Sequence, residues 1–262
     1  MIRVRKRFGQ HFLEPAWVAK VIRAIDPRSN EEFIEIGAGA GALTRPLAER
    51  AKSVTAYEID HDLAADLGAA AIANVTVVDG DFLQTAAETL DAGTPNPIRV
   101  AGNLPYNVAA PMLFKLAELY GGGVPIADAT LMLQREVADR LTARPGTREY
   151  GVLSVLMQHV ATIELLLRLP AGAFRPPPNV LSSLLRLRFH APDPPVADSI
   201  AFAAVVQAVF TRRRKTLANA LLAHTDSSRA AGALTATAID GTRRPETLSV
   251  AEFARLSNAM AD

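Results

Sequence analysis

Short apolar runs alternate with longer segments of helical periodicity between residues 15 and 142. Strands that are covered on both faces need not alternate apolar with polar side chains, so the short runs indicate buried strands. Strands that alternate with helices favour an α/β fold with a doubly wound, mostly parallel sheet. The predicted strands are residues 33–36, 54–58, 75–78, 98–101 and 129–133, and the predicted helices are residues 15–25, 42–51, 62–73, 109–120 and 136–142.

Two further strand-like runs, residues 163–169 and 182–189, are joined by a segment rich in proline, alanine and glycine. A connection of this kind is typical of neighbouring antiparallel strands. We therefore expect this pair at one edge of the sheet, which makes the sheet mixed.

A linker with three prolines follows at residues 191–195. Beyond it the pattern predicts helices only, at residues 196–210, 215–224, 227–234 and 250–260. Ser249 and Glu252 have the spacing of a capped helix start. The chain is thus predicted to have a first domain over residues 1–190 and a small all-helical domain over residues 196–262.

Composition and charge narrow the classes of protein. The 262 residues are 49% hydrophobic and 21% charged, which is ordinary for a globular protein, and the absence of cysteine excludes disulfides, thiolate metal sites and a cysteine nucleophile. The net charge is +1, so any surface that binds nucleic acid must be local. Basic residues cluster at 3–7, 212–215 and 243–244. Because no apolar run is long enough to cross a bilayer, we expect a cytoplasmic protein without membrane contact.

A glycine-rich turn follows the first strand of the predicted sheet. Gly37, Gly39 and Gly41 would let the backbone pass close to a bound nucleotide. The second strand ends about twenty residues later in Glu58, which is placed to accept both hydroxyls of a ribose. The same turn also satisfies the fingerprint of a nicotinamide dinucleotide site, so an oxidoreductase is an alternative.

Two later strand ends favour a different nucleotide and a different reaction. The third strand ends near Asp81, which could accept the amine of a bound adenine or could instead cap a turn. The fourth ends in Asn103-Leu104-Pro105-Tyr106. The amide oxygen of Asn103 and a backbone carbonyl of the Leu104-Pro105 turn could each accept an N–H of an adenine amine, which draws the nitrogen lone pair out of conjugation. Tyr106 would then stack on the extruded base.

With these motifs in view, the chain resembles the ribosomal RNA adenine dimethyltransferases that use S-adenosylmethionine, in particular the bacterial small-subunit enzymes. The resemblance implies a Rossmann-like class I methyltransferase sheet with a small helical C-terminal domain. It also implies dimethylation of two adjacent adenosines in the 3′-terminal hairpin of 16S ribosomal RNA during ribosome assembly. The matching segments are residues 9–13, 35–44, 57–60, 80–83, 102–107, 174–180 and 210–217.

The resemblance also implies roles for single residues. In the cofactor site, His11 and Leu13 line the methionine end, Gly37 and Gly39 form the turn beneath it, Glu58 holds the ribose, Asp81 holds the adenine and Asn103 faces the methyl group. The family often has asparagine at position 11, so His11 is expected to contact the cofactor through either its side chain or its backbone.

For the RNA, the resemblance implies that Phe174 closes on the target base opposite Tyr106. Arg212, Arg213, Arg214 and Lys215 would begin a helix of the second domain and meet RNA phosphates. The scheme is a direct in-line transfer that requires no metal and no general base. We expect a monomer that acts on an assembly intermediate of the small subunit.

Two alternatives besides the oxidoreductase stay open at this point. A large-subunit RNA methyltransferase of the macrolide-resistance type would share the chemistry of the Asn103 turn. A non-enzymatic assembly factor would bind RNA and keep its role after Asn103→Ala.

Overall fold

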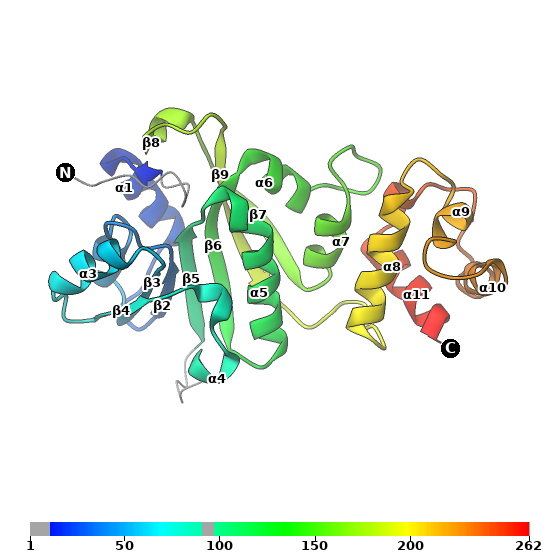
Figure 1. The fold of residues 1–262 in the computed structure, drawn as a ribbon, viewed down its shortest axis with the longest axis horizontal. Helices are drawn as coiled ribbons and strands as arrows, with labels where there is room; N and C mark the ends of the chain where they lie inside the picture. The colour runs from blue at the N-terminus through cyan, green and yellow to red at the C-terminus, as the bar shows by residue number, and fades with distance from the viewer. Residues whose placement is uncertain (1–10, 91–96, 262) are drawn as a thin grey trace. The chain divides into compact units, whose positions relative to one another are not determined.

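The computed structural model describes residues 11–90 and 97–261 (Figure 1). The first basic cluster, residues 3–7, lies outside the described residues. The chain forms two compact units. The first contains the sheet and runs to Ala138, with Ile163–Phe189 added. The second contains Asp139–Thr162 and the helices after His190, so a segment that the sequence assigned to the first domain belongs to the second unit.

A seven-stranded sheet is the framework of the first unit, in the order β4-β3-β2-β5-β6-β9-β7. The strands from β4 to β6 are parallel, and β9 is antiparallel to β6. The prediction of a mixed, mostly parallel sheet is therefore confirmed, and β7 and β9 are neighbours at one edge as expected. The strands are β2 (Glu32–Ile36), β3 (Ser53–Glu58), β4 (Val75–Asp79), β5 (Ile98–Asn103), β6 (Ile126–Gln134), β7 (Ala161–Leu169) and β9 (Ser182–Phe189).

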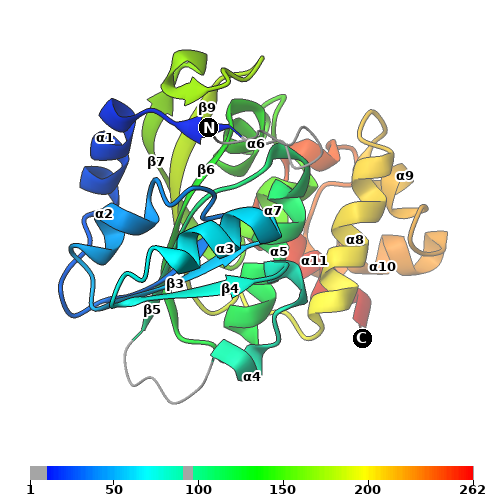
Figure 2. The same cartoon turned by 60° about the vertical axis from the view of Figure 1, so that its left-hand side comes forward.

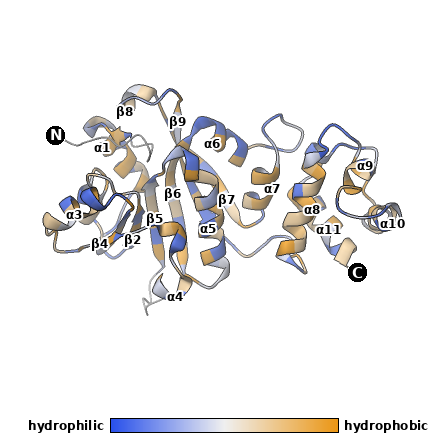
Figure 3. Ribbon diagram, viewed as in Figure 1, coloured by the Kyte–Doolittle hydropathy of each residue, from blue (hydrophilic) through white to orange (hydrophobic). Residues whose placement is uncertain are grey.

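Helices lie on both sides of this sheet, with α1 and α5 on opposite faces in the two views of Figures 1 and 2. Because helices cover both faces of the sheet, β5 and β6 are hydrophobic along most of their length. The outer helix α6 is mostly hydrophilic (Figure 3). The helices of this unit are α1 (Pro15–Ile25), α2 (Thr44–Ala48), α3 (His61–Ala69), α4 (Ala87–Leu90), α5 (Ala109–Gly121) and α6 (Arg135–Leu141).

A two-stranded pair that the sequence pattern did not predict lies beside the large sheet. It joins β1 (Phe12–Leu13) antiparallel to β8 (Phe174–Arg175), with Leu13 opposite Phe174. An ion pair between Glu14 and Arg175 and the hydrogen bond from the Glu14 amide to the Ala173 carbonyl extend the contact. The segment before α1 is thereby attached to the proline-rich loop that precedes β9.

The second unit packs its helices around a core of its own. Its helices are α7 (Val152–Gln158), α8 (Ser199–Thr211), α9 (Leu217–Leu221), α10 (Ser227–Thr237) and α11 (Val250–Ala261). The predicted cap of the last helix is confirmed, because the Ser249 hydroxyl accepts the Glu252 amide and the Glu252 carboxylate accepts the Ser249 amide. No helix of residues 11–90 and 97–261 is long and apolar enough to cross a membrane.

The prediction that Arg212 to Lys215 begin a helix is wrong. Residues 212–215 form turns after α8, and α9 begins only at Leu217. The first amides of α9 explain this start, because the Leu217 amide donates to the Arg243 carbonyl and the Ala218 amide donates to the Gly241 carbonyl. The segment around residues 241–243 thus accepts the first two amides of α9. If the helix began earlier, these amides would instead donate to carbonyls one turn before them in the same helix.

A buried arginine near the N-terminal ends of β5 and β6 connects these strands to the end of α1. The Arg99 guanidinium donates to both carboxylate oxygens of Asp128, at 3.1 and 3.0 Å. It also donates to the Glu31 carboxylate at 2.8 Å and to the Ile25 carbonyl at 2.8 Å, near the end of α1. Its side chain is only 9% exposed.

Replacing Arg99 with alanine should therefore leave the buried Asp128 carboxylate with only its longer ion pair to Arg186, at 3.6 Å. The expected cost is about 3 kcal/mol of unfolding free energy, the lower end of the range for breaking a buried pair. The exposed pair of Arg188 and Glu164 provides a matched control, because Arg188→Ala should cost at most about 1 kcal/mol. Urea unfolding followed by circular dichroism compares the two variants. Equal losses in both variants would contradict a special role for the buried arginine.

Candidate active site

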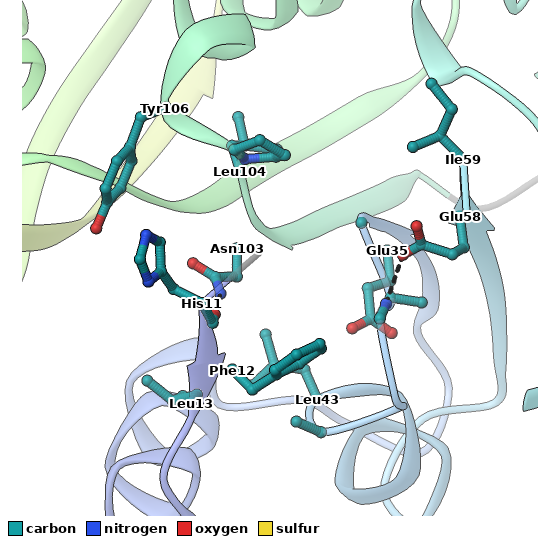
Figure 4. Close-up of a pocket in the computed structure, with 15 residues that line it drawn as sticks. His11, Phe12, Leu13, Glu35, Leu43, Glu58, Ile59, Asn103, Leu104 and Tyr106 are labelled. Carbon is teal, nitrogen blue, oxygen red and sulfur yellow. Dashed lines mark hydrogen bonds between the residues drawn. The ribbon is translucent and has the colours of Figure 1, made fainter. Parts of the chain in front are cut away.

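The strands β2, β3, β4 and β5 are parallel, so their carboxyl ends meet at one edge of the sheet. In an open α/β sheet, ligands bind outside this edge. Figure 4 shows the side chains that converge there from three of these strand ends, from the segment around β1 and from the turn before α2.

The glycine turn after β2 is tied to the neighbouring strand. The amides of Gly37 and Ala38 both donate to the Tyr57 carbonyl, at 2.9 and 3.1 Å. Gly39 has a φ of +56°, which favours glycine, and a Cβ atom there would lie 3.3 Å from the Phe12 ring. The turn therefore adopts a conformation in which backbone forms the floor of the site.

Glu58, at the end of β3, is held by two backbone donors. Its Oε2 accepts the Gly39 amide at 2.6 Å, and its Oε1 accepts the Asp60 amide at 2.9 Å. Each carboxylate oxygen retains a further lone pair. The side chain is thus preorganised as an acceptor beside the turn, and its contact with a ribose stays a prediction.

Asn103, at the end of β5, is fixed by the segment before β1. Its Nδ2 donates to the His11 backbone carbonyl at 2.8 Å. Because a carbonyl can only accept, the side-chain oxygen of Asn103 is left as an acceptor on the other side of the amide. The backbone of the next residue is fixed too, since the Leu104 amide donates to the Met132 carbonyl at 3.3 Å.

Two rings face each other beside Asn103. The centroids of His11 and Tyr106 are 5.6 Å apart and their planes are inclined by 27°. The Tyr106 hydroxyl hydrogen-bonds to the Ser182 hydroxyl at 2.9 Å, and His11 Nδ1 lies 2.7 Å from the Pro176 carbonyl. That contact requires a proton on His11 Nδ1, because the carbonyl has none to donate. The His11 side chain is therefore directed at Tyr106 and the proline-rich loop.

Phe174 is not placed as the sequence led us to expect. Its side chain is 2% exposed and belongs to the hydrophobic core with Leu13 and Ala173. It does not line the cavity that contains Tyr106. Pairing of β8 with β1 turns this ring inward, so the predicted aromatic partner of Tyr106 is replaced in this structure by His11.

Two adjoining cavities occupy the edge of the sheet, and they share Gly37, Ile59 and Pro105. The first is lined by the predicted residues His11, Leu13, Gly37, Gly39, Glu58, Asn103, Leu104, Pro105 and Tyr106. The second is lined by Asp81, Tyr57 and Phe82, among others. Asp81 also accepts the Leu83 amide at 3.0 Å and so caps a short helical turn, which confirms the capping interpretation, while its contact with an adenine stays a prediction.

Glu35 is a residue of the first cavity to which the sequence interpretation gave no role. It lies in β2, is 1% exposed, and its Oε2 has no hydrogen-bond partner among the described residues. Burial raises the pKa of this carboxyl to about 8, and the charge of Glu58 adds to the rise, while hydrogen bonding by Thr44 opposes it. The available signal was an acidic residue within the apolar run of residues 33–36, two positions before Gly37.

The basic cluster of the second unit is divided in its roles. Arg213 donates to the carbonyls of Arg148 and Thr147, at 2.7 and 3.0 Å, and Arg212 donates to the Asn219 carbonyl at 3.2 Å. Arg214 and Lys215 are exposed, and their side chains make no hydrogen bond or ion pair with any other residue in the described ranges.

An open mixed sheet, a glycine turn and acidic strand ends around two joined cavities define a Rossmann-like class I methyltransferase. The 23S rRNA methyltransferase ErmE is a solved structure of this kind, with a TM-score of 0.69 and 28% identity over 96% of this chain and 100% of that chain. A dimethyladenosine transferase from Plasmodium falciparum has a TM-score of 0.77 over 94% of this chain and 96% of its own, and at 24% identity it supports the fold.

Within that class, the chain belongs to the ribosomal RNA adenine dimethylase family, whose sequence model matches residues 1–262. A protein from Acinetobacter baylyi named Ribosomal RNA small subunit methyltransferase A is 43% identical over 98% of this chain and 93% of its own. A protein of the same name from Chromohalobacter salexigens is 42% identical over 99% of this chain and 92% of its own. The protein is thus an S-adenosylmethionine-dependent methyltransferase of adenine in ribosomal RNA, and the nicotinamide alternative is not retained.

Proposed function

We propose that this protein dimethylates two adjacent adenosines in the 3′-terminal hairpin of 16S ribosomal RNA, in an assembly intermediate of the small subunit. The observation that carries the proposal is the fixed amide of Asn103, whose free oxygen lies in the cavity wall beside Tyr106. The names of the relatives at 42–43% identity support the small subunit as the substrate. The expected cytoplasmic location and monomeric state stay predictions.

The residues of the two cavities fit S-adenosylmethionine. The cofactor supplies an electrophilic methyl group on a positively charged sulfur. Glu58 would accept the ribose hydroxyls with the lone pairs that its two backbone donors leave, and Asp81 would accept the adenine amine from the second cavity. His11, Leu13, Gly37 and Gly39 would surround the methionine end in the first cavity.

Asn103 and the Leu104 carbonyl would act on the target adenine. Each would accept one N–H of the exocyclic amine, which makes its lone pair available for in-line attack. Both groups are held before the substrate arrives, by the His11 carbonyl and the Met132 carbonyl respectively, so little reorganisation is needed. The proton leaves after transfer, and this scheme assigns no residue as a general base. For the second transfer one N–H remains to be held.

Tyr106 would stack on the extruded base. Its ring is fixed by the bond to Ser182, but the face toward His11 is covered, because rings 5.6 Å apart leave no room for a third ring between them. We infer that the His11 ring moves aside when a base enters on that face. Phe174, buried against Leu13, is not needed in this scheme.

Asn103→Ala should lower methyl transfer to unmethylated small subunits by about 10²–10³-fold, the usual loss when one preorganised polar group is removed. The measurement is incorporation of labelled methyl into dimethyladenosine, with cofactor affinity measured separately by calorimetry. Asn30→Ala is a matched control, because Asn30 is exposed and precedes β2 at the opposite edge of the sheet. Normal incorporation by Asn103→Ala would refute the proposed role.

The same assay separates the remaining candidate functions. Label in large-subunit RNA alone would assign the protein to the substrate named for ErmE. If Asn103→Ala still supports subunit assembly while transfer is lost, an assembly role exists beside the methylation.

We further propose that Arg214 and Lys215 contact RNA phosphates, whereas Arg212 and Arg213 hold the turn in shape. The bonds of Arg213 to the carbonyls of Thr147 and Arg148 fasten residues 144–149 beside the turn. Arg144 and Arg148 are also exposed on that segment, so the fastening adds positive charge near Arg214.

The double variant Arg214→Ala, Lys215→Ala should weaken binding to small subunits and reduce the slope of log K against log salt by about 1.4–1.8, for two lost phosphate contacts. Arg213→Ala should instead lower the melting temperature, because two backbone acceptors lose their donor. Arg255→Ala, which removes one exposed charge from α11, is the control for net charge. An unchanged salt slope in the double variant would contradict the proposal.

A further inference from the structure

Glu35 and Glu58 lie on the same wall of the first cavity. Figure 4 shows the two side chains next to each other, Glu35 from β2 and Glu58 from β3. The Glu58 carboxylate is satisfied by two amides, whereas Glu35 Oε2 is buried and has no partner among the described residues. Among residues 11–90 and 97–261, those that line this cavity include no lysine and no arginine. The described part of the wall therefore carries two acidic side chains and no cation.

Burial without a neighbouring cation raises the free energy of an ionised carboxylate, so the neutral, protonated form is favoured. Burial raises the pKa of Glu35 to about 8, with Glu58 adding to the rise. At pH 7 the empty site therefore holds Glu35 mostly as the neutral acid. The groups that act on Glu35 are Thr44 of α2, by hydrogen bonding, and Glu58 of β3, by its charge. The other polar side chains that line this cavity in the described part of the chain are His11 beside β1 and Asn103 from β5.

The ligand of this cavity changes its charge during the reaction. S-adenosylmethionine carries a sulfonium, an ammonium and a carboxylate, which sum to +1. When the methyl group leaves, the bonding electron pair stays on sulfur, and the resulting thioether product has a net charge of zero. A buried carboxylate that shares the cavity is stabilised by the first ligand far more than by the second.

We propose that Glu35 distinguishes the cofactor from its product by charge: its carboxyl group releases a proton to solvent when the cationic cofactor fills the cavity, and takes one back when the neutral product remains. The inference rests on the proposed placement of the cofactor in this cavity. Its consequence is that the site binds the cofactor in preference to the product, since the cost of ionising Glu35 is offset by the cofactor alone.

The direct test is a proton count by titration calorimetry at pH 7.0, in buffers of different ionisation enthalpy. Wild-type protein should release up to about 0.9 proton on binding S-adenosylmethionine, the fraction of Glu35 that is protonated when its pKa is about 8. With S-adenosylhomocysteine the release should be less than half as large. This comparison uses one unchanged protein, so it does not depend on the folding of a variant.

Glu35→Gln is the matched variant, because glutamine imitates the neutral acid but cannot ionise. It should release no proton and should lose at least about fivefold of the preference for cofactor over product, with a melting curve to confirm folding. Glu32→Gln is the control for loss of a carboxylate, because Glu32 is also in β2 but does not line the cavity, and it should keep the proton release.

The outcomes separate failure of this inference from failure of the proposed function. If wild-type protein binds the cofactor without proton release, or if Glu35→Gln releases as many protons as wild type, the charge-reading role of Glu35 is wrong and the proposed function stands. If wild-type protein releases equal numbers of protons with both ligands, discrimination by charge is wrong. If it does not bind the cofactor at all, the placement underlying the proposed function fails as well.

Discussion

The close approach of β2 and β5 is the constraint on which the site depends. Gly102 lies opposite Ile36, and a Cβ atom at Gly102 would stand 2.7 Å from the Ile36 carbonyl oxygen, which no real side chain tolerates. Only with glycine there can β5 run along β2 to its end and bring Asn103 against the glycine turn. One pairing of parallel strands thus brings Asn103 and the glycine turn together, while the His11 carbonyl fixes the orientation of the Asn103 amide.

The acidic side chains at the site differ in their hydrogen-bond donors and therefore in their charge. Glu58 accepts two backbone amides, Asp81 accepts the amide of the turn that it caps, and the buried Oε2 of Glu35 has no partner among the described residues. Backbone donors favour the charged form of a carboxylate, whereas burial without donors favours the neutral acid. Under the inference proposed above, the first cavity therefore holds one fixed acceptor and one carboxyl group whose charge depends on the bound ligand.

The sequence predicted the central sheet because buried parallel strands leave continuous apolar runs, and it predicted α1 and the cap of α11 because proline, serine and glutamate mark helix starts locally. It did not predict the pairing of β1 with β8, since two residues form no pattern. The inward turn of Phe174 follows from that pairing and could not be foreseen either. The different roles of Arg213 and Arg214 could not be predicted either, because Arg213 bonds to Arg148, which is 65 positions away in the sequence. The raised pKa of Glu35 results from burial in the folded protein, which the local sequence does not show.

The pairing of β1 with β8 has a consequence for the order in which the molecule is made. His11 and Pro176, which are 165 positions apart, meet through the His11 ring, and the His11 carbonyl is what fixes Asn103. During synthesis the sheet from β4 to β6 can pair long before the proline-rich loop leaves the ribosome, but β1 has no partner strand until β8 has emerged. A half-made chain therefore has the fold's framework without a finished methyl-transfer site, and the last step of assembling the site joins the beginning of the chain to its second half.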